Sequence, residues 1–157
     1  LVAPAFERIV GPVVKNMERL GIEASIRIVD PAQYQNRVED FDYDVIVGSR
    51  GQSLSPGNEQ RNYWTTASAD IRGSGNLAGV RDAAVDELVN LVIQARDRTG
   101  LVAATRALDR VLLSGYYVIP NWHIRSFRVL YWNKFGHMPV PPKYGLGFPD
   151  TWWVIKQ

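Results

Sequence analysis

The chain has 157 residues, the length of a single domain, with 46% hydrophobic, 22% charged and 11% aromatic residues, as in ordinary globular proteins. The absence of cysteine excludes a disulfide framework, a thiolate metal site and cysteine catalysis, and a net charge of +2 gives weak support for nucleic-acid binding. No apolar run approaches the roughly 18 residues that a transmembrane helix needs.

The first part of the chain predicts a helix followed by a strand. Apolar residues at helical spacing predict an amphipathic helix over 4–20, which Pro12 is expected to kink. Alternating apolar and polar residues then predict a half-buried strand over 22–29. Because the chain opens with Leu1 and shows no signal-peptide pattern, we expect any export signal to have been removed and the chain to be part of a longer protein.

A second helix and a second strand follow. Asp30 before Pro31 is typical of a helix N-cap, so a short helix is expected to run to about Val38. The apolar β-branched run within 43–48 is typical of a fully buried strand. This alternation of helices and strands predicts an α/β lobe with a twisted sheet.

The segment 49–80 shows little periodicity and is rich in Gly, Ser and Asn. Irregular loops of this length are uncommon in compact domains and are usually functional or disordered. Tyr63 and Trp64 argue against disorder, so we interpret the segment as an ordered, functional loop. The alternative is a surface excursion anchored by its own aromatic residues.

The second half of the chain predicts two helices, two strands and a tail. Asp82 and Thr99 are expected to cap the two helices, and Gly115 to end the second. Strands are predicted over 116–119 and 126–132. The stretch from Phe135 to Trp153 is rich in proline and aromatic residues and predicts an extended tail that lies on another part of the protein.

No catalytic constellation emerges from the sequence. His123 and His137 lack the spacing of a metal-binding motif, and a structural role is expected for His123. The carboxylates Asp40, Asp42 and Asp44 lack the remaining features of a calcium loop and are interpreted as a solvated turn. The sequence therefore predicts no metal site, no cofactor and no enzymatic activity.

A ligand site is predicted where the strand over 43–48 ends, because ligands of open α/β sheets bind outside the carboxyl ends of strands. Arg50 suits a carboxylate, since a guanidinium binds it through two hydrogen bonds, and the nearby amides both donate and accept. The alternative is a polar surface loop without a ligand. The candidate ligand-binding residues are Arg50, Gly51, Gln52, Ser53, Asn58, Glu59 and Trp64.

Four sequence segments together resemble family 5 extracellular solute-binding proteins, the receptors of oligopeptide and dipeptide ABC importers. They are VDPAQYQNRVEDFDYDVIVGS, SLSPGNEQRNYW, NLAGVRDAAVDELV and VPPKYGLGFPDTWW. The subgroup that the chain resembles most is associated with murein-derived and microcin C-type peptides. The resemblance covers essentially the whole chain.

This resemblance implies the later lobe of a type 2 periplasmic-binding-protein fold, incomplete here, with a mixed twisted sheet flanked by helices. Residues 1–134 are expected to form the ligand-binding lobe, and residues 135–157 a tail that packs on the missing first lobe. The implied function is the substrate-binding component of an ABC importer, which holds a peptide or peptide-like solute between two lobes. It implies a permease of the inner membrane as partner, and a periplasmic or lipid-anchored extracellular location.

One residue departs from the family pattern. In typical family members an aspartate near position 52 pairs with the α-ammonium group of the ligand, and here that position holds Gln52. Either Glu59 supplies the charge, or the ligand amine is blocked, absent or bound elsewhere. A receptor for a non-peptide solute, a hydrolase completed by residues outside this chain, and an interaction domain with exposed aromatic residues therefore remain alternatives.

Overall fold

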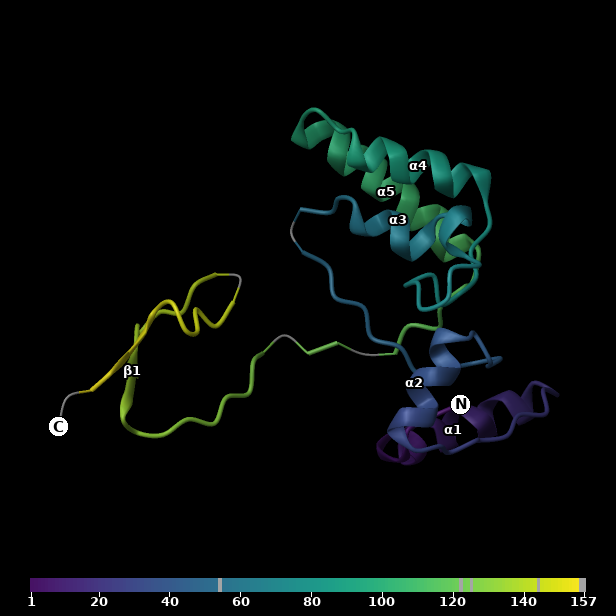
Figure 1. Ribbon diagram of the computed structural model, residues 1–157, viewed down its shortest axis with the longest axis horizontal. Helices are drawn as coiled ribbons and strands as arrows, with labels where there is room; N and C mark the ends of the chain where they lie inside the picture. The colour runs from purple at the N-terminus through teal and green to yellow at the C-terminus, as the bar shows by residue number, and fades with distance from the viewer. Residues whose placement is uncertain (54, 122, 125, 144, 156–157) are drawn as a thin grey trace. The chain divides into compact units, whose positions relative to one another are not determined.

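The computed structural model describes residues 1–53, 55–121, 123–124, 126–143 and 145–155 and divides into two compact units, Leu1–Ile119 and Pro120–Gln157. Figure 1 shows the course of the chain. Its elements are the 3-10 helix η1 (Pro4–Phe6), α1 (Glu7–Arg19), α2 (Pro31–Glu39), α3 (Glu59–Trp64), the 3-10 helix η2 (Thr66–Ser68), α4 (Ala83–Ile93), α5 (Arg98–Ser114), β1 (Phe135–His137) and β2 (Trp152–Val154).

Helices α1, α2, α4 and α5 follow the predictions closely, whereas α3 lies in a segment that was predicted to be a loop. Two N-caps form as the sequence indicates. Asp30 accepts hydrogen bonds from the backbone N–H groups of Ala32 and Gln33, at 2.9 and 3.0 Å, and so begins α2. Asp82 caps α4 in the same way. The cap of α5 differs from the prediction, because Asp97 rather than Thr99 accepts the N–H of Gly100 at 2.7 Å.

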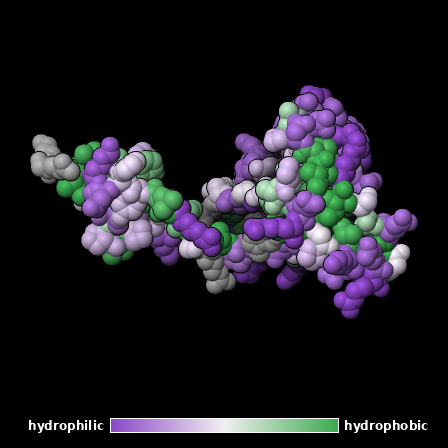
Figure 2. All heavy atoms as spheres, turned by 90° about the horizontal axis from the view of Figure 1, so that it is seen from below, coloured by the Kyte–Doolittle hydropathy of each residue, from purple (hydrophilic) through white to green (hydrophobic). Residues whose placement is uncertain are grey.

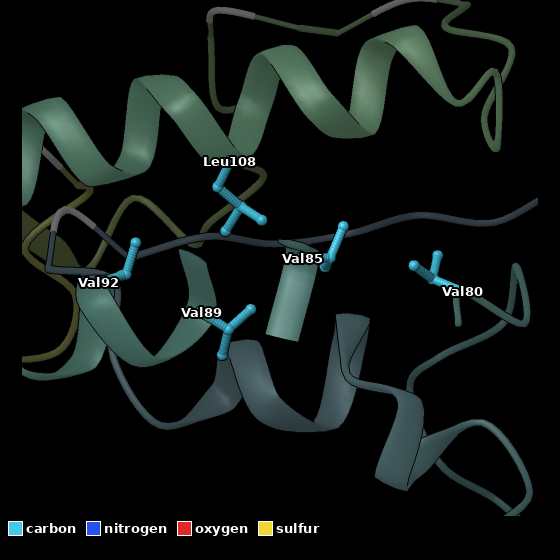
Figure 3. Packing of buried hydrophobic residues seen from close by; sticks show 5 residues of the cluster. All are labelled: Val80, Val85, Val89, Val92 and Leu108. Carbon is cyan, nitrogen blue, oxygen red and sulfur yellow. The ribbon is translucent and has the colours of Figure 1, made fainter. Parts of the chain in front are cut away.

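The hydrophobic core of the first unit lies between α4 and α5, with α3 packed on α4 (Figure 1). Its buried side chains come from α4, from α5 and from the turn before α4, and Figure 3 shows them. Contacts of this kind stabilise a helix pair because apolar surface leaves water. The cluster consists of Val80, Val85, Val89, Val92 and Leu108.

The strands predicted for the first unit are largely wrong. Over 22–29, only Ile28 forms a bridge, a parallel one with Val2. The run over 43–48 is irregular, and Val45 is 56% exposed rather than buried. The segment 116–119 is irregular too. A strand needs a neighbouring strand for its backbone groups, and in this unit the described residues offer only the bridge at Val2.

Two tyrosine hydroxyls, and not a neighbouring strand, connect the 43–48 segment to other parts of the unit. The hydroxyl of Tyr34 on α2 donates to the carbonyl of Val47 at 2.9 Å, and that of Tyr43 donates to the carbonyl of Leu77 at 2.8 Å. Arg72 forms ion pairs with Glu39 and Asp40 at the end of α2. The two tyrosine hydrogen bonds hold the chain that leads to Arg50 against α2 and against the turn before α4, and the ion pairs of Arg72 hold the segment before that turn at the end of α2.

The described residues of the second unit form one small sheet. Strands β1 and β2 are antiparallel, with Phe135 opposite Val154 and His137 opposite Trp152. No strand forms at the described positions of 126–132, so that prediction is wrong as well. The unit begins at Pro120.

Many apolar side chains of both units are exposed. Figure 2 shows a band of hydrophobic atoms across one face of the unit that contains the N-terminus. Among the described residues, no helix combines the length and apolarity that crossing a membrane requires. Fully or mostly exposed apolar side chains include Leu20, Tyr116, Phe127, Leu130 and Trp132.

Candidate functional site

The structure joins four of the seven predicted site residues into one connected group. Arg50 and Gln52 belong to the loop after the 43–48 segment, and Glu59 and Trp64 are the first and last residues of α3. Their side chains are linked by ring contacts and hydrogen bonds, directly or through Gln60. We call the group of Arg50, Gln52, Glu59, Gln60 and Trp64 the loop–helix cluster.

Arg50 lies over two aromatic rings. Its guanidinium carbon is 4.4 Å from the centroid of the Trp64 ring and 5.2 Å from that of Tyr63. The two rings meet edge to face, with centroids 6.5 Å apart. Cation–π attraction of this kind holds a guanidinium in place while its N–H groups remain available at its edge.

Gly75 allows the chain to pass close beneath Tyr63. A Cβ at this position would lie 2.5 Å from the ring of Tyr63, which is shorter than real contacts allow. The N–H of Gly75 donates to the side-chain oxygen of Asn62 at 3.2 Å. The absence of a side chain at Gly75 thus lets the ring of Tyr63 lie where it supports Arg50.

The charge of Arg50 has no acidic partner in the described part of the chain. None of the ion pairs found there involves this guanidinium. Burial lowers the pKa of Arg50, and the hydroxyls of Tyr63 and Tyr43 act in the opposite direction. Because a guanidinium titrates far above neutral pH, Arg50 stays charged and can bind an anion.

Gln52 and Gln60 connect the loop to the helix. The amide nitrogen of Gln52 donates to Oε1 of Glu59 at 2.9 Å, and that of Gln60 donates to the amide oxygen of Gln52 at 2.6 Å. The indole N–H of Trp64 donates to the amide oxygen of Gln60 at 3.1 Å. Gln60 is only 5% exposed, and both its amide nitrogen and its amide oxygen form hydrogen bonds within the protein, as buried polar groups require.

One carboxylate oxygen of Glu59 accepts several hydrogen bonds. Its Oε1 accepts from Gln52, from the backbone N–H of Gly57 at 2.9 Å and from Gln60 at 3.3 Å. These bonds, with the one from Gln52 the strongest, lower the pKa of Glu59 from 4.5 to about 2. The carboxylate is therefore ionised at every physiological pH.

The other three predicted site residues lie outside the loop–helix cluster. The hydroxyl of Ser53 donates to the carbonyl of Ser55 at 2.9 Å and so forms a local turn. Asn58 precedes α3 without a side-chain capping bond. Around Gly51, nothing lies within 4 Å of the position that a Cβ would take.

Two residues that position Arg50 and Trp64 were absent from the sequence-based set, namely Gln60 and Tyr63. Gln60 and Trp64 are four residues apart and so share one face of a helix, a signal that needs α3 to be recognised first. The sequence of 49–80 reads as a loop because α3 has only six residues and no side-chain cap.

Two surface hollows lie elsewhere. One, of about 400 Å³, runs beside α3, η2 and α4 and is lined by polar side chains including Arg61, Asp86 and Asn90. The other, of about 190 Å³, lies in the second unit and is lined by Tyr131, His137 and Trp152. No group of acidic or histidine side chains among the described residues is suited to hold a metal ion.

Comparison with known proteins relates the chain to binding proteins. It is 49% identical, over 96% of its length, to a protein of Agrobacterium fabrum named "Probable peptide-binding protein YejA", and 40% identical over 98% to that organism's "Peptidoglycan-binding protein YepA". It spans about a quarter of the length of these relatives, at 24% and 25%. No protein-family model matches the sequence.

Among solved structures, the chain is similar to the periplasmic binding protein DppA from Helicobacter pylori, described in complex with the peptide STSA. The TM-score is 0.64 at 13% identity, and the match covers 71% of this chain and 22% of that one. This likeness confirms the predicted fold, although most of the expected sheet is missing among the described residues. The resemblance inferred from the sequence is confirmed by the relatives: the chain matches one part of longer proteins that are named for peptide binding and peptidoglycan binding.

Proposed function

We propose that this chain is part of the substrate-binding component of an ABC importer that captures a peptide or peptide-like solute. The observation that carries the proposal is its 49% identity, across nearly the whole chain, to a protein named for peptide binding. The proposed role is binding without catalysis, and the names of the relatives support the binding part of this role. The implied partner is a permease of the inner membrane, and the implied location is the periplasm.

The loop–helix cluster supports this function. Arg50 forms no ion pair with another described residue and lies on a fixed aromatic support, which suits a carboxylate of a peptide. Gly51, Ser53 and Asn58 lie in the same loop and expose short polar side chains or backbone groups. We propose that the ligand lies along this loop, in a cleft completed by a second lobe, and that residues 135–157 pack on that lobe.

A peptidoglycan-derived peptide is the second candidate ligand. It is favoured by the 40% identity to the protein named as peptidoglycan-binding. Such a peptide also carries carboxylates, so Arg50 has the same role for either ligand. The two candidates differ in the ligand alone and leave the proposed transport role unchanged.

The experiment is to identify what the complete protein that carries this sequence binds. Small molecules released from the purified protein are analysed by mass spectrometry, and candidates are titrated back by calorimetry. We expect peptides or peptidoglycan-derived peptides, bound intact. Recovery of sugars or metal chelates instead, or cleavage of an added peptide, would contradict the proposal.

A further inference from the structure

We infer that Glu59 and Gln52 are positioning residues, which hold Arg50 ready to bind a carboxylate of the ligand without themselves contacting it. This inference rests on the proposed function and adds the residues that position Arg50 for a carboxylate. The relevant observation is that the contacts of the loop–helix cluster form a closed ring between two segments of the chain.

The ring runs through both segments. Arg50 lies on Trp64, the indole of Trp64 donates to Gln60, and Gln60 donates to Gln52, which is two residues from Arg50 along the chain. A ring of this kind restrains Arg50 twice, through its own backbone and through the aromatic ring beneath it. Binding then requires less ordering of a long, flexible side chain.

Gln52 has little left to offer a ligand. Its amide nitrogen donates to Glu59 at 2.9 Å and to the carbonyl of Ser53 at 3.3 Å, which uses both of its N–H groups. Its oxygen accepts from Gln60. The side chain at position 52 thus connects parts of the protein to one another.

Glu59 is the centre of these connections. Its Oε1 accepts from the loop at Gln52 and Gly57 and from the helix at Gln60, so one ionised oxygen fixes three groups. The resulting bonds are charge-assisted and therefore stronger than those of a neutral acceptor. No described basic side chain forms an ion pair with Glu59. Glu59 therefore does not neutralise Arg50, and the guanidinium can pair with a carboxylate of the ligand.

The test measures selectivity for a carboxylate in the complete protein that carries this sequence. Trialanine is compared with trialanine amide, and the amides of Ala-Glu-Ala and Ala-Gln-Ala are compared with each other, so that terminal and side-chain carboxylates are distinguished. We expect a preference of about tenfold or more for the free carboxylate in one of the two pairs. Arg50→Met should abolish this preference.

Gln52→Met and Glu59→Gln should reduce the same preference severalfold. A merely structural role would weaken both members of each pair equally. The matched controls are Gln35→Met and Glu87→Gln, because Gln35 also donates to a glutamate, Glu39, at 2.9 Å on an exposed helix surface, and Glu87 is exposed on α4. Both controls should leave the preference unchanged.

A second measurement is independent of the ligand. The indole N–H resonance of Trp64, assigned by its loss in Trp64→Phe, should shift in Gln52→Met and in Glu59→Gln but remain in place in Gln35→Met. Resonances that stay in place would overturn the inference, as would an unchanged carboxylate preference in both variants. Failure of the complete protein to bind any peptide, including these four and peptidoglycan-derived peptides, would instead contradict the proposed function.

Discussion

The helix pair α4 and α5 and the segment 126–132 before β1 both carry regularly spaced apolar residues, yet the helices fully or partly bury most of theirs and the segment leaves Phe127 and Leu130 exposed. In α4 and α5, Val85, Val89 and Leu108 are buried against one another. In the segment before β1, Phe127 and Leu130 are exposed, Leu130 fully. A helix satisfies its backbone hydrogen bonds within itself, whereas an extended segment needs neighbouring strands before its side chains can be buried.

The largest expected effect is on the free energy of unfolding, where the buried Leu108 is compared with the exposed Leu130. Leu108→Ala should lower the free energy of unfolding of the 157-residue chain by about 2–5 kcal/mol, because it removes a buried side chain and leaves a cavity. Leu130→Ala should change it by less than about 0.5 kcal/mol. Urea unfolding measures both values. A comparable loss for Leu130 would mean that the extended segment is packed in solution.

The buried side chain of Asn76 provides the next test. It forms hydrogen bonds with backbone groups of an irregular segment, whereas in a helix the backbone groups bond to one another. The side chain of Asn76 donates to the carbonyls of Thr65 and Val80, both at 3.0 Å, and accepts the N–H of Val80 at 2.8 Å. Asn76→Ala leaves these groups buried and unpaired, which should cost about 1–3 kcal/mol. The exposed Asn36→Ala, measured in the same urea series, should cost much less. Equal losses would contradict the buried role of Asn76.

The beginning of α5 provides a smaller effect. Asp97→Ala should cost about 1 kcal/mol, since the aspartate accepts the N–H of Gly100 at the exposed start of the helix. Thr99→Ala should be close to neutral, because Thr99 lies inside the helix rather than at its cap. Thermal unfolding of both variants decides between the two positions. A larger loss at Thr99 would restore the cap predicted from the sequence.

Helices could be predicted from the sequence more reliably than strands, because helix signals are local and strand pairing is not. Helices α1, α2, α4 and α5 were predictable because their spacing, caps and terminal residues are local signals. The strands over 22–29, 43–48 and 126–132 were predicted from side-chain pattern alone. That pattern shows which residues suit a strand but not whether a partner strand is present.

The candidate site shows the same limit. Arg50, Gln52, Glu59 and Trp64 were proposed because polar and aromatic residues gather after an apolar run, and the structure connects all four. Gln60 was missed because its importance depends on burial. No local pattern reveals that its two ends connect a loop to an indole.

The last prediction concerns Glu59, whose carboxylate links the loop of Gln52 and Gly57 to helix α3. The donors on its carboxylate lower its pKa in the folded chain from 4.5 to about 2. Because the folded pKa is below the unfolded value, the stabilisation is complete above about pH 4.5 and is lost as the pH falls through about 2. Gln52→Met removes the strongest of these donors and should raise the pKa of Glu59 towards its ordinary value. Carbon NMR titration of the glutamate carboxyl groups measures the change, and an unmoved pKa in Gln52→Met would show that the backbone N–H groups of Gly57 and Glu59 and the amide of Gln60 keep the pKa low without Gln52.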